Sequence, residues 1–69
     1  MDLITYPQAE ATVAYLKATF GACNFQELTI VRDRVLGFAV YAFVFSSNLY
    51  HQLPAWYNGC PVRTRWCPY

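Results

Sequence analysis

The spacing of apolar residues near the start of the chain predicts an amphipathic helix of about four turns. Thr5 and Gln8 stand at the spacing of a capping box, Pro7 suits a first helical turn, and Gly21 suits the residue after the last turn. We therefore expect a helix between Thr5 and Gly21 that packs on one side only. The apolar residues that line this side are Ala9, Val13, Leu16 and Phe20.

Two strands are predicted after this helix. Residues 25–32 are rich in β-branched and aromatic side chains, and apolar and polar positions alternate along them. The charged residues 32–34 form the turn that follows, and Gly37 either closes this turn or marks a bulge. Residues 38–45 are apolar on both alternating faces, which is typical of a central strand covered on both sides.

A short helical turn and a last strand complete the pattern. Residues 46–48, Ser-Ser-Asn, offer an N-cap for a short helical turn through residues 49–53, and Pro54 prevents a longer helix. The Asn-Gly pair at 58–59 is a turn signal, and residues 60–67 after it alternate between two faces. One face of this strand carries Val62, Thr64 and Trp66, and the other carries Arg63 and Arg65.

These elements predict an α+β fold in a single small domain that spans residues 1–69. One N-terminal helix packs on a three-stranded antiparallel sheet, with a short helical turn before the last strand. The second sheet face needs a homodimer, a protein partner or residues 46–59 to keep its rings from water. The expected core contains Val13, Leu16, Phe20, Val40, Ala42 and Val44, and the expected second face contains Ala39, Tyr41, Phe43 and Phe45.

The composition strengthens the expectation of an interaction surface. Apolar residues make up 57% of the 69 residues and aromatic residues 19%, whereas ordinary domains hold about 45–50% apolar residues. A domain this small buries only about 60% of the surface that its unfolded chain exposes, so some aromatic rings are expected outside the core. Contiguous exposed apolar surface marks a site of interaction.

Charge and hydropathy argue against bulk nucleic-acid binding, a membrane span and secretion. Five basic and four acidic residues give a formal net charge of +1, which provides no broad electrostatic field for nucleic acid. The longest apolar run, residues 35–45, is about half as long as a membrane-spanning helix. Residues 1–5 lack the pattern of a secretory signal, so the expected location is the cytoplasm, or the host cytoplasm if a phage encodes the protein.

The sequence contains no catalytic constellation and no cofactor motif. His51 is the single histidine, and no nucleophile motif surrounds any of the cysteines. The acidic residues Asp2, Glu10, Glu27 and Asp33 are scattered over different elements, which argues against a carboxylate pair for acid–base chemistry. We therefore expect a protein that is not an enzyme and needs no cofactor.

The cysteines do not have the spacing of a structural metal site. Cys23, Cys60 and Cys67 contain no Cys-x-x-Cys pair, although His51 would bring the number of candidate ligands to that of a zinc site. Structural zinc sites draw their ligands from pairs roughly two to four residues apart, so no metal is expected. The thiols are interpreted as reduced, with a Cys60–Cys67 disulfide as the alternative under oxidising conditions.

Arginine and aromatic residues mark the candidate binding surface. Trp, Tyr and Arg dominate the binding energy of protein interfaces, and similar sets form stacking platforms for RNA. The low net charge favours the protein-binding interpretation. The candidate partner-binding residues are Arg63, Arg65, Trp66, Tyr41, Phe43, Phe45, Trp56 and Tyr57.

The predicted function is a non-enzymatic protein that binds a larger protein or protein complex and blocks or modulates it. In size and character, though in no particular motif, the chain resembles the small inhibitors that phages and mobile elements direct against host defence, including the anti-CRISPR proteins. Two alternatives stay open. One is a small nucleic-acid-binding or RNA-cleaving module of toxin type that uses Arg32, Arg34, Arg63 and Arg65. The other is a structural subunit that self-associates.

Overall fold

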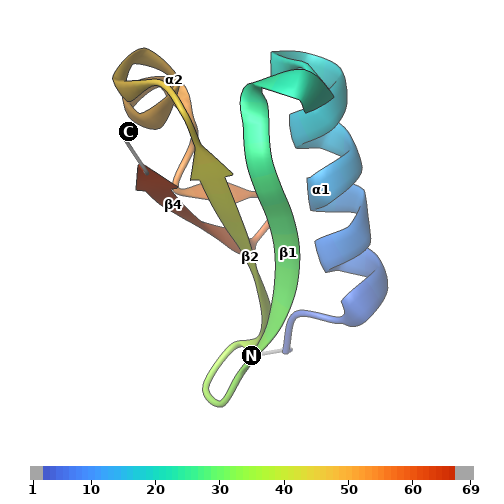
Figure 1. The fold of residues 1–69 in the computed structure, drawn as a ribbon. Coiled ribbons are helices and arrows are strands. Elements are labelled where there is room, and N and C mark those ends of the chain that lie inside the picture. Colours follow the sequence, from blue (N-terminus) through green and yellow to red (C-terminus); the bar gives the residue numbers. More distant parts are fainter. Residues whose placement is uncertain (1–2, 67–69) are drawn as a thin grey trace.

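The computed structural model describes residues 3–66, which form two α-helices, a short 3-10 helix and four strands. In chain order these elements are α1, η1, β1, β2, α2, β3 and β4 (Figure 1). The predicted α+β class is confirmed. The bounds are Tyr6–Phe20 for α1, Ala22–Asn24 for η1, Phe25–Asp33 for β1, Gly37–Val44 for β2, Ser47–Gln52 for α2, Trp56–Tyr57 for β3 and Cys60–Trp66 for β4.

The first helix begins and ends where its caps predict. The Thr5 hydroxyl accepts the N–H of Gln8 at 3.3 Å, and the Gln8 side chain accepts the N–H of Thr5 at 3.0 Å. This capping box satisfies two amides that the helix itself leaves without a partner. Gly21 follows the last turn with a φ of 89°, a conformation that glycine adopts without strain. The fully buried residues of α1 are Ala9, Thr12 and Leu16.

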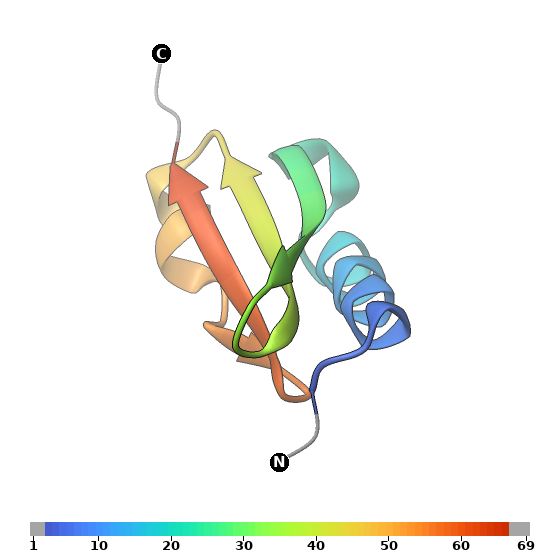
Figure 2. The same ribbon diagram turned by 90° about the horizontal axis from the view of Figure 1, so that it is seen from below.

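The sheet has four strands in the order β1-β2-β4-β3 and is mixed. β1 pairs antiparallel with β2 and β3 with β4, whereas β2 and β4 run parallel, as their arrows show in Figure 2. The prediction of a three-stranded antiparallel sheet was therefore wrong in detail. The chain from Val44 to Cys60 crosses over with α2 and returns to the end of the sheet where β2 began, so β4 enters parallel to β2.

The additional strand comes from the predicted Asn-Gly turn. Asn58 and Gly59 have φ values of 52° and 85°, and this pair of positive values is the geometry of a tight two-residue hairpin. The turn folds Trp56 and Tyr57 back against Pro61 and Cys60. β3 is only two residues long, which is too short for an alternating pattern to predict a strand.

Both α-helices pack on one face of the sheet, which we call the helix face. The buried cluster on this face joins Ala9 and Leu16 of α1 and Leu49 of α2 to the even-numbered sheet residues Val40, Ala42, Val44, Cys60 and Val62. The opposite face, which we call the open face, has no helix from the described residues. Within residues 3–66, helices therefore cover only one of the two faces on which residues 38–45 were expected to be covered, and cover of the other face by a partner stays a prediction. By register the open face carries Glu27, Thr29, Val31, Asp33, Ala39, Tyr41, Phe43, Trp56, Pro61, Arg63 and Arg65.

Candidate functional site

Five of the eight predicted partner-binding residues come together on the open face. Tyr41 lies opposite Arg63 and Phe43 opposite Arg65 on the neighbouring strands β2 and β4. Trp56 of β3 lies opposite Pro61 of β4, which places it on the same face. Tyr41, Phe43 and Arg63 are half-buried, whereas Trp56 and Arg65 are exposed.

The ring of Tyr41 lies close to the Phe43 ring and to the guanidinium groups of Arg63 and Arg65. The Cζ atoms of Arg63 and Arg65 lie 5.9 and 5.7 Å from the centroid of the Tyr41 ring. Both distances are within the range of about 6 Å over which a ring face attracts a cation. The Phe43 ring follows at 6.5 Å from that of Tyr41. Tyr41 is therefore the centre of this arginine–aromatic cluster.

The two arginines differ in how they are held. Arg63 Nη2 donates to Asp33 Oδ2 at 2.8 Å, and Arg63 Nη1 lies 3.4 Å from the Tyr41 hydroxyl. Arg65 makes no ion pair within residues 3–66, and its Nη1 donates to the Thr64 carbonyl at 3.5 Å. Arg63 is thus fixed in place by a carboxylate, whereas Arg65 presents its charge to solvent.

The sequence indicated only that Asp33 belongs to a turn, but its side chain also joins this turn to Arg63. Its Oδ1 accepts the backbone N–H of Val35 and of Leu36, each at 2.8 Å. These two backbone hydrogen bonds, and then the charge of Arg63, hold the pKa of Asp33 below its ordinary value. No local sequence pattern could reveal the link to Arg63, because the two residues are 30 positions apart.

The other three predicted site residues lie elsewhere. Tyr57 stacks on Tyr15 of α1, with ring centroids 3.9 Å apart, so it holds β3 against the helix. Trp66 lies on the helix face of β4, as its position in the strand predicted, and its Nε1 donates to the Phe45 carbonyl at 3.2 Å. Phe45 was expected on the open face, but β2 ends at Val44 and the chain bends at Phe45.

The four arginines of the alternative nucleic-acid patch do not share one face. Arg32 lies opposite Phe38 and therefore points to the helix face. It is near the end of β1, where the helices no longer cover the sheet, and it is exposed. Arg34 belongs to the turn between β1 and β2. Only Arg63 and Arg65 of this set are side by side on the open face.

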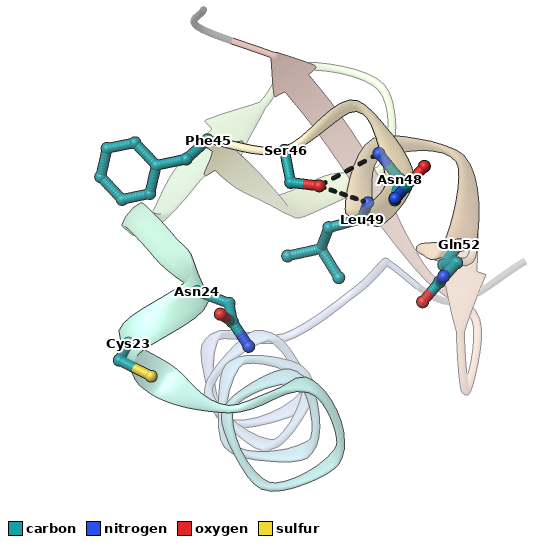
Figure 3. Close-up of a pocket in the computed structure, with 7 residues that line it drawn as sticks. All are labelled: Cys23, Asn24, Phe45, Ser46, Asn48, Leu49 and Gln52. Carbon is teal, nitrogen blue, oxygen red and sulfur yellow. Dashed lines mark hydrogen bonds between the residues drawn. The ribbon is translucent and has the colours of Figure 1, made fainter.

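A hollow of about 260 Å³ lies between η1 and α2 (Figure 3). Its polar groups are largely used to cap helices: Asn24 Nδ2 donates to the Phe20 carbonyl at 2.6 Å, and the Ser46 hydroxyl accepts the N–H groups of Asn48 and Leu49. Leu49 in turn belongs to the core cluster. Because Asn24 and Ser46 are used for helix capping, this hollow is a weaker candidate site than the open face.

Within residues 3–66, the two cysteines Cys23 and Cys60 do not share a site. Cys60 is buried in the core, and Cys23 is exposed on η1. No group of three His, Cys, Asp or Glu side chains in residues 3–66 could hold a metal ion. Cys67 and the predicted end of the last strand lie outside the described residues, so the Cys60–Cys67 alternative is untested.

Comparison with known proteins does not assign a family or a function to the chain. Neither protein-family models, nor curated proteins, nor solved structures gave a match to the chain. None of the helices within residues 3–66 is long and apolar enough to cross a membrane.

Proposed function

We propose that this chain is a non-enzymatic protein-binding module that acts in the cytoplasm and blocks or modulates a larger protein through its open face. The observation that supports the proposal is the cluster of Tyr41, Phe43 and Arg65 on a sheet face that no helix of residues 3–66 covers. Such a face favours a mode of action in which the protein covers a functional surface of a larger complex, as small phage-encoded inhibitors do.

The charge of the open face favours a protein partner over a nucleic acid. Arg63 is neutralised by Asp33, and Glu27 lies opposite Phe43 on the neighbouring strand, so the face carries two carboxylates and two guanidinium groups. A face without excess positive charge gains little from the release of counterions by a phosphate backbone. Arg65 then serves as a single directed charge, with the rings of Phe43 and Tyr41 as neighbours, which is the chemistry of a protein hot spot.

The same cluster gives the nucleic-acid alternative its one supporting observation. A tyrosine ring within cation–π distance of two guanidinium groups, on an uncovered sheet face, is a surface on which an unpaired base could stack. Salt distinguishes the two proposals, because phosphate contacts weaken steeply as the salt concentration rises.

The proposal is tested by affinity capture with the tagged protein from a nuclease-treated bacterial lysate. We expect the wild type to retain a protein at high salt, and Phe43→Ala and Arg65→Ala to lose it. Lys17→Ala, which removes an exposed charge on the opposite side of the fold, is the matched control and should retain the partner. In a parallel capture from untreated lysate, retention of nucleic acid that falls steeply with salt would contradict the proposal. A dimer in sedimentation that Phe43→Ala disrupts would instead support the self-association alternative.

A further inference from the structure

In the part of the chain that the structure describes, the outer edge of β4 has no partner strand over most of its length. β3 pairs only through Trp56 with Pro61 and Tyr57 with Cys60, and one further hydrogen bond joins the Val62 N–H to the Ala55 carbonyl at 2.8 Å. Before Ala55 the chain leaves the sheet: Pro54 has no N–H to continue the ladder, and α2 precedes it. Within residues 3–66 no strand covers the edge of β4 beyond Val62.

The backbone groups that face this edge follow from the Val62 hydrogen bond. Successive residues of a strand direct their N–H and C=O groups to opposite sides, so Thr64 and Trp66 point the same way as Val62. The contact of Arg65 Nη1 with the Thr64 carbonyl agrees, because a side chain reaches this carbonyl most readily where no strand covers it. The edge therefore offers the N–H groups of Thr64 and Trp66 for pairing, and it offers the Thr64 C=O once the long 3.5 Å contact with Arg65 Nη1 is given up.

A hollow of about 410 Å³ lies beside this edge. It is lined by residues from both faces of β4, namely Thr64 and Trp66 from the helix face and Arg65 from the open face, together with Tyr50 and His51 of α2. Since β2 occupies the inner edge of β4, residues from its two faces line one hollow only at the outer edge. α2 and β4 thus form the two walls of a groove along the unpaired edge.

The charges along this edge disfavour a second copy of the chain. The open-face residues of this edge are Arg63 and Arg65. In a two-fold antiparallel pairing of β4 with itself, side chains directly opposite point to the same face. Every such register centred on Arg63, Thr64 or Arg65 then places an arginine opposite an arginine, and like charges in this position are destabilising. Charged residues at a sheet edge are a common protection against self-association.

We propose that this edge accepts an extended segment of the partner protein as an added strand, with an acidic side chain beside Arg65 and apolar side chains towards Tyr50 and Trp66. Main-chain hydrogen bonds to Thr64 and Trp66 provide the attachment, and the alternating side chains provide the selection. The inference deepens the proposed function, on which it rests for the existence of a protein partner. Arg65 belongs to both surfaces and connects them.

Binding of labelled synthetic peptides to the purified protein, followed by fluorescence anisotropy, tests the proposal. The probe is the peptide Thr-Val-Glu-Val-Glu-Val-Thr, and its basic counterpart carries Lys in place of Glu. Two further probes carry N-methyl groups on the Val residues or on the Glu residues. We expect the acidic peptide to bind more than about tenfold more tightly than the basic one, and one methylated series, but not the other, to lose binding by a similar factor. Arg65→Glu should reverse the preference between acidic and basic peptides, whereas Lys17→Glu should not.

Equal binding of both methylated series would overturn the proposal, because it would show charge attraction without strand pairing. The absence of saturable binding at millimolar acidic peptide would overturn it as well. Amide exchange gives a direct readout, and we expect the amides of Thr64 and Trp66 to be protected when the peptide binds. Phe43→Ala separates this proposal from the proposed function, since it should abolish protein capture through the open face and leave peptide binding at the edge unchanged.

Discussion

Arg63 of β4 is held by Asp33 at the end of β1, with 2.8 Å between Nη2 and Oδ2. Because the second oxygen of the same carboxylate accepts two backbone N–H groups of the β1–β2 turn, Asp33 joins that turn to β4 across the open face. Two arginines that look equivalent in the sequence thus have different roles. Arg63 is part of the architecture of the face, and Arg65 is the residue that a partner can use.

Asp33→Asn should lower the free energy of unfolding at neutral pH. Asn keeps the shape of the side chain but cannot neutralise Arg63 and accepts the turn hydrogen bonds more weakly. The pKa of Asp33 is below its ordinary value of 3.8, so its contribution is complete above that value and is lost as the pH falls through the lower folded value. Urea unfolding of both proteins should show a difference in stability that shrinks below pH 3.8. A difference that is independent of pH would exclude the carboxylate as its cause.

Gly37 is predicted to tolerate no side chain. It has a φ of 102°, and a Cβ atom at this position would collide with the backbone of Ile4, whose N–H donates to the Leu36 carbonyl at 2.7 Å. Gly37→Ala should destabilise the protein by about 3 kcal/mol, since it combines a strained backbone with overpacking. Thermal unfolding measures this loss. Gly59→Ala is the control, because its φ of 85° is also strained but its Cβ has space, so it should cost less.

Local signals in the sequence were sufficient for the elements and insufficient for their arrangement. The capping box at Thr5, the stop at Gly21 and a helix N-cap within residues 46–48 depend on neighbours within a few residues, and the structure confirms them, with Ser46 as the cap. The direction of β4 depends on where the crossover through α2 returns, which no residue of β4 encodes. Thr12 shows a limit of the apolar pattern, because this polar residue occupies a fully buried core position. Its burial is tolerated because its hydroxyl donates to the Gln8 carbonyl at 2.9 Å.

Leu16→Ala and Phe43→Ala should separate the core from the open face. Leu16 is fully buried, and its truncation should cost about 2–5 kcal/mol of stability. Phe43 is half-buried on the open face, where a cross-strand contact contributes about 1 kcal/mol or less. Chemical denaturation should therefore show a large loss for Leu16→Ala and a small one for Phe43→Ala. A loss of similar size in the two variants would show that the Phe43 ring belongs to a packed core.

The part of the site that could be predicted from the sequence is the part that depends on the alternation of side chains along a strand. Alternation placed Tyr41 and Phe43 on one face, and Arg63 and Arg65 on one face, and the register of β2 with β4 joins these two pairs. It failed for Phe45, because the strand ends one residue earlier at Val44. It also could not tell that Tyr57 is used for packing on Tyr15, since the contact depends on how α1 crosses the sheet.

The separate roles of Arg63 and Arg65 lead to different expectations for their alanine variants. Arg65 is exposed and without an ion pair in the described part of the chain, so Arg65→Ala should change stability by no more than about 0.5 kcal/mol. Its effect on partner binding should be larger, about 2 kcal/mol or more if it is a hot spot. Arg63→Ala should weaken both properties, because it leaves Asp33 without its charge partner and removes a hydrogen bond to Tyr41. Thermal unfolding and partner titration of the two variants provide the test. If Arg65→Ala binds the captured partner as tightly as the wild type does, the exposed guanidinium is not part of the binding surface, and the open face must act through its rings alone.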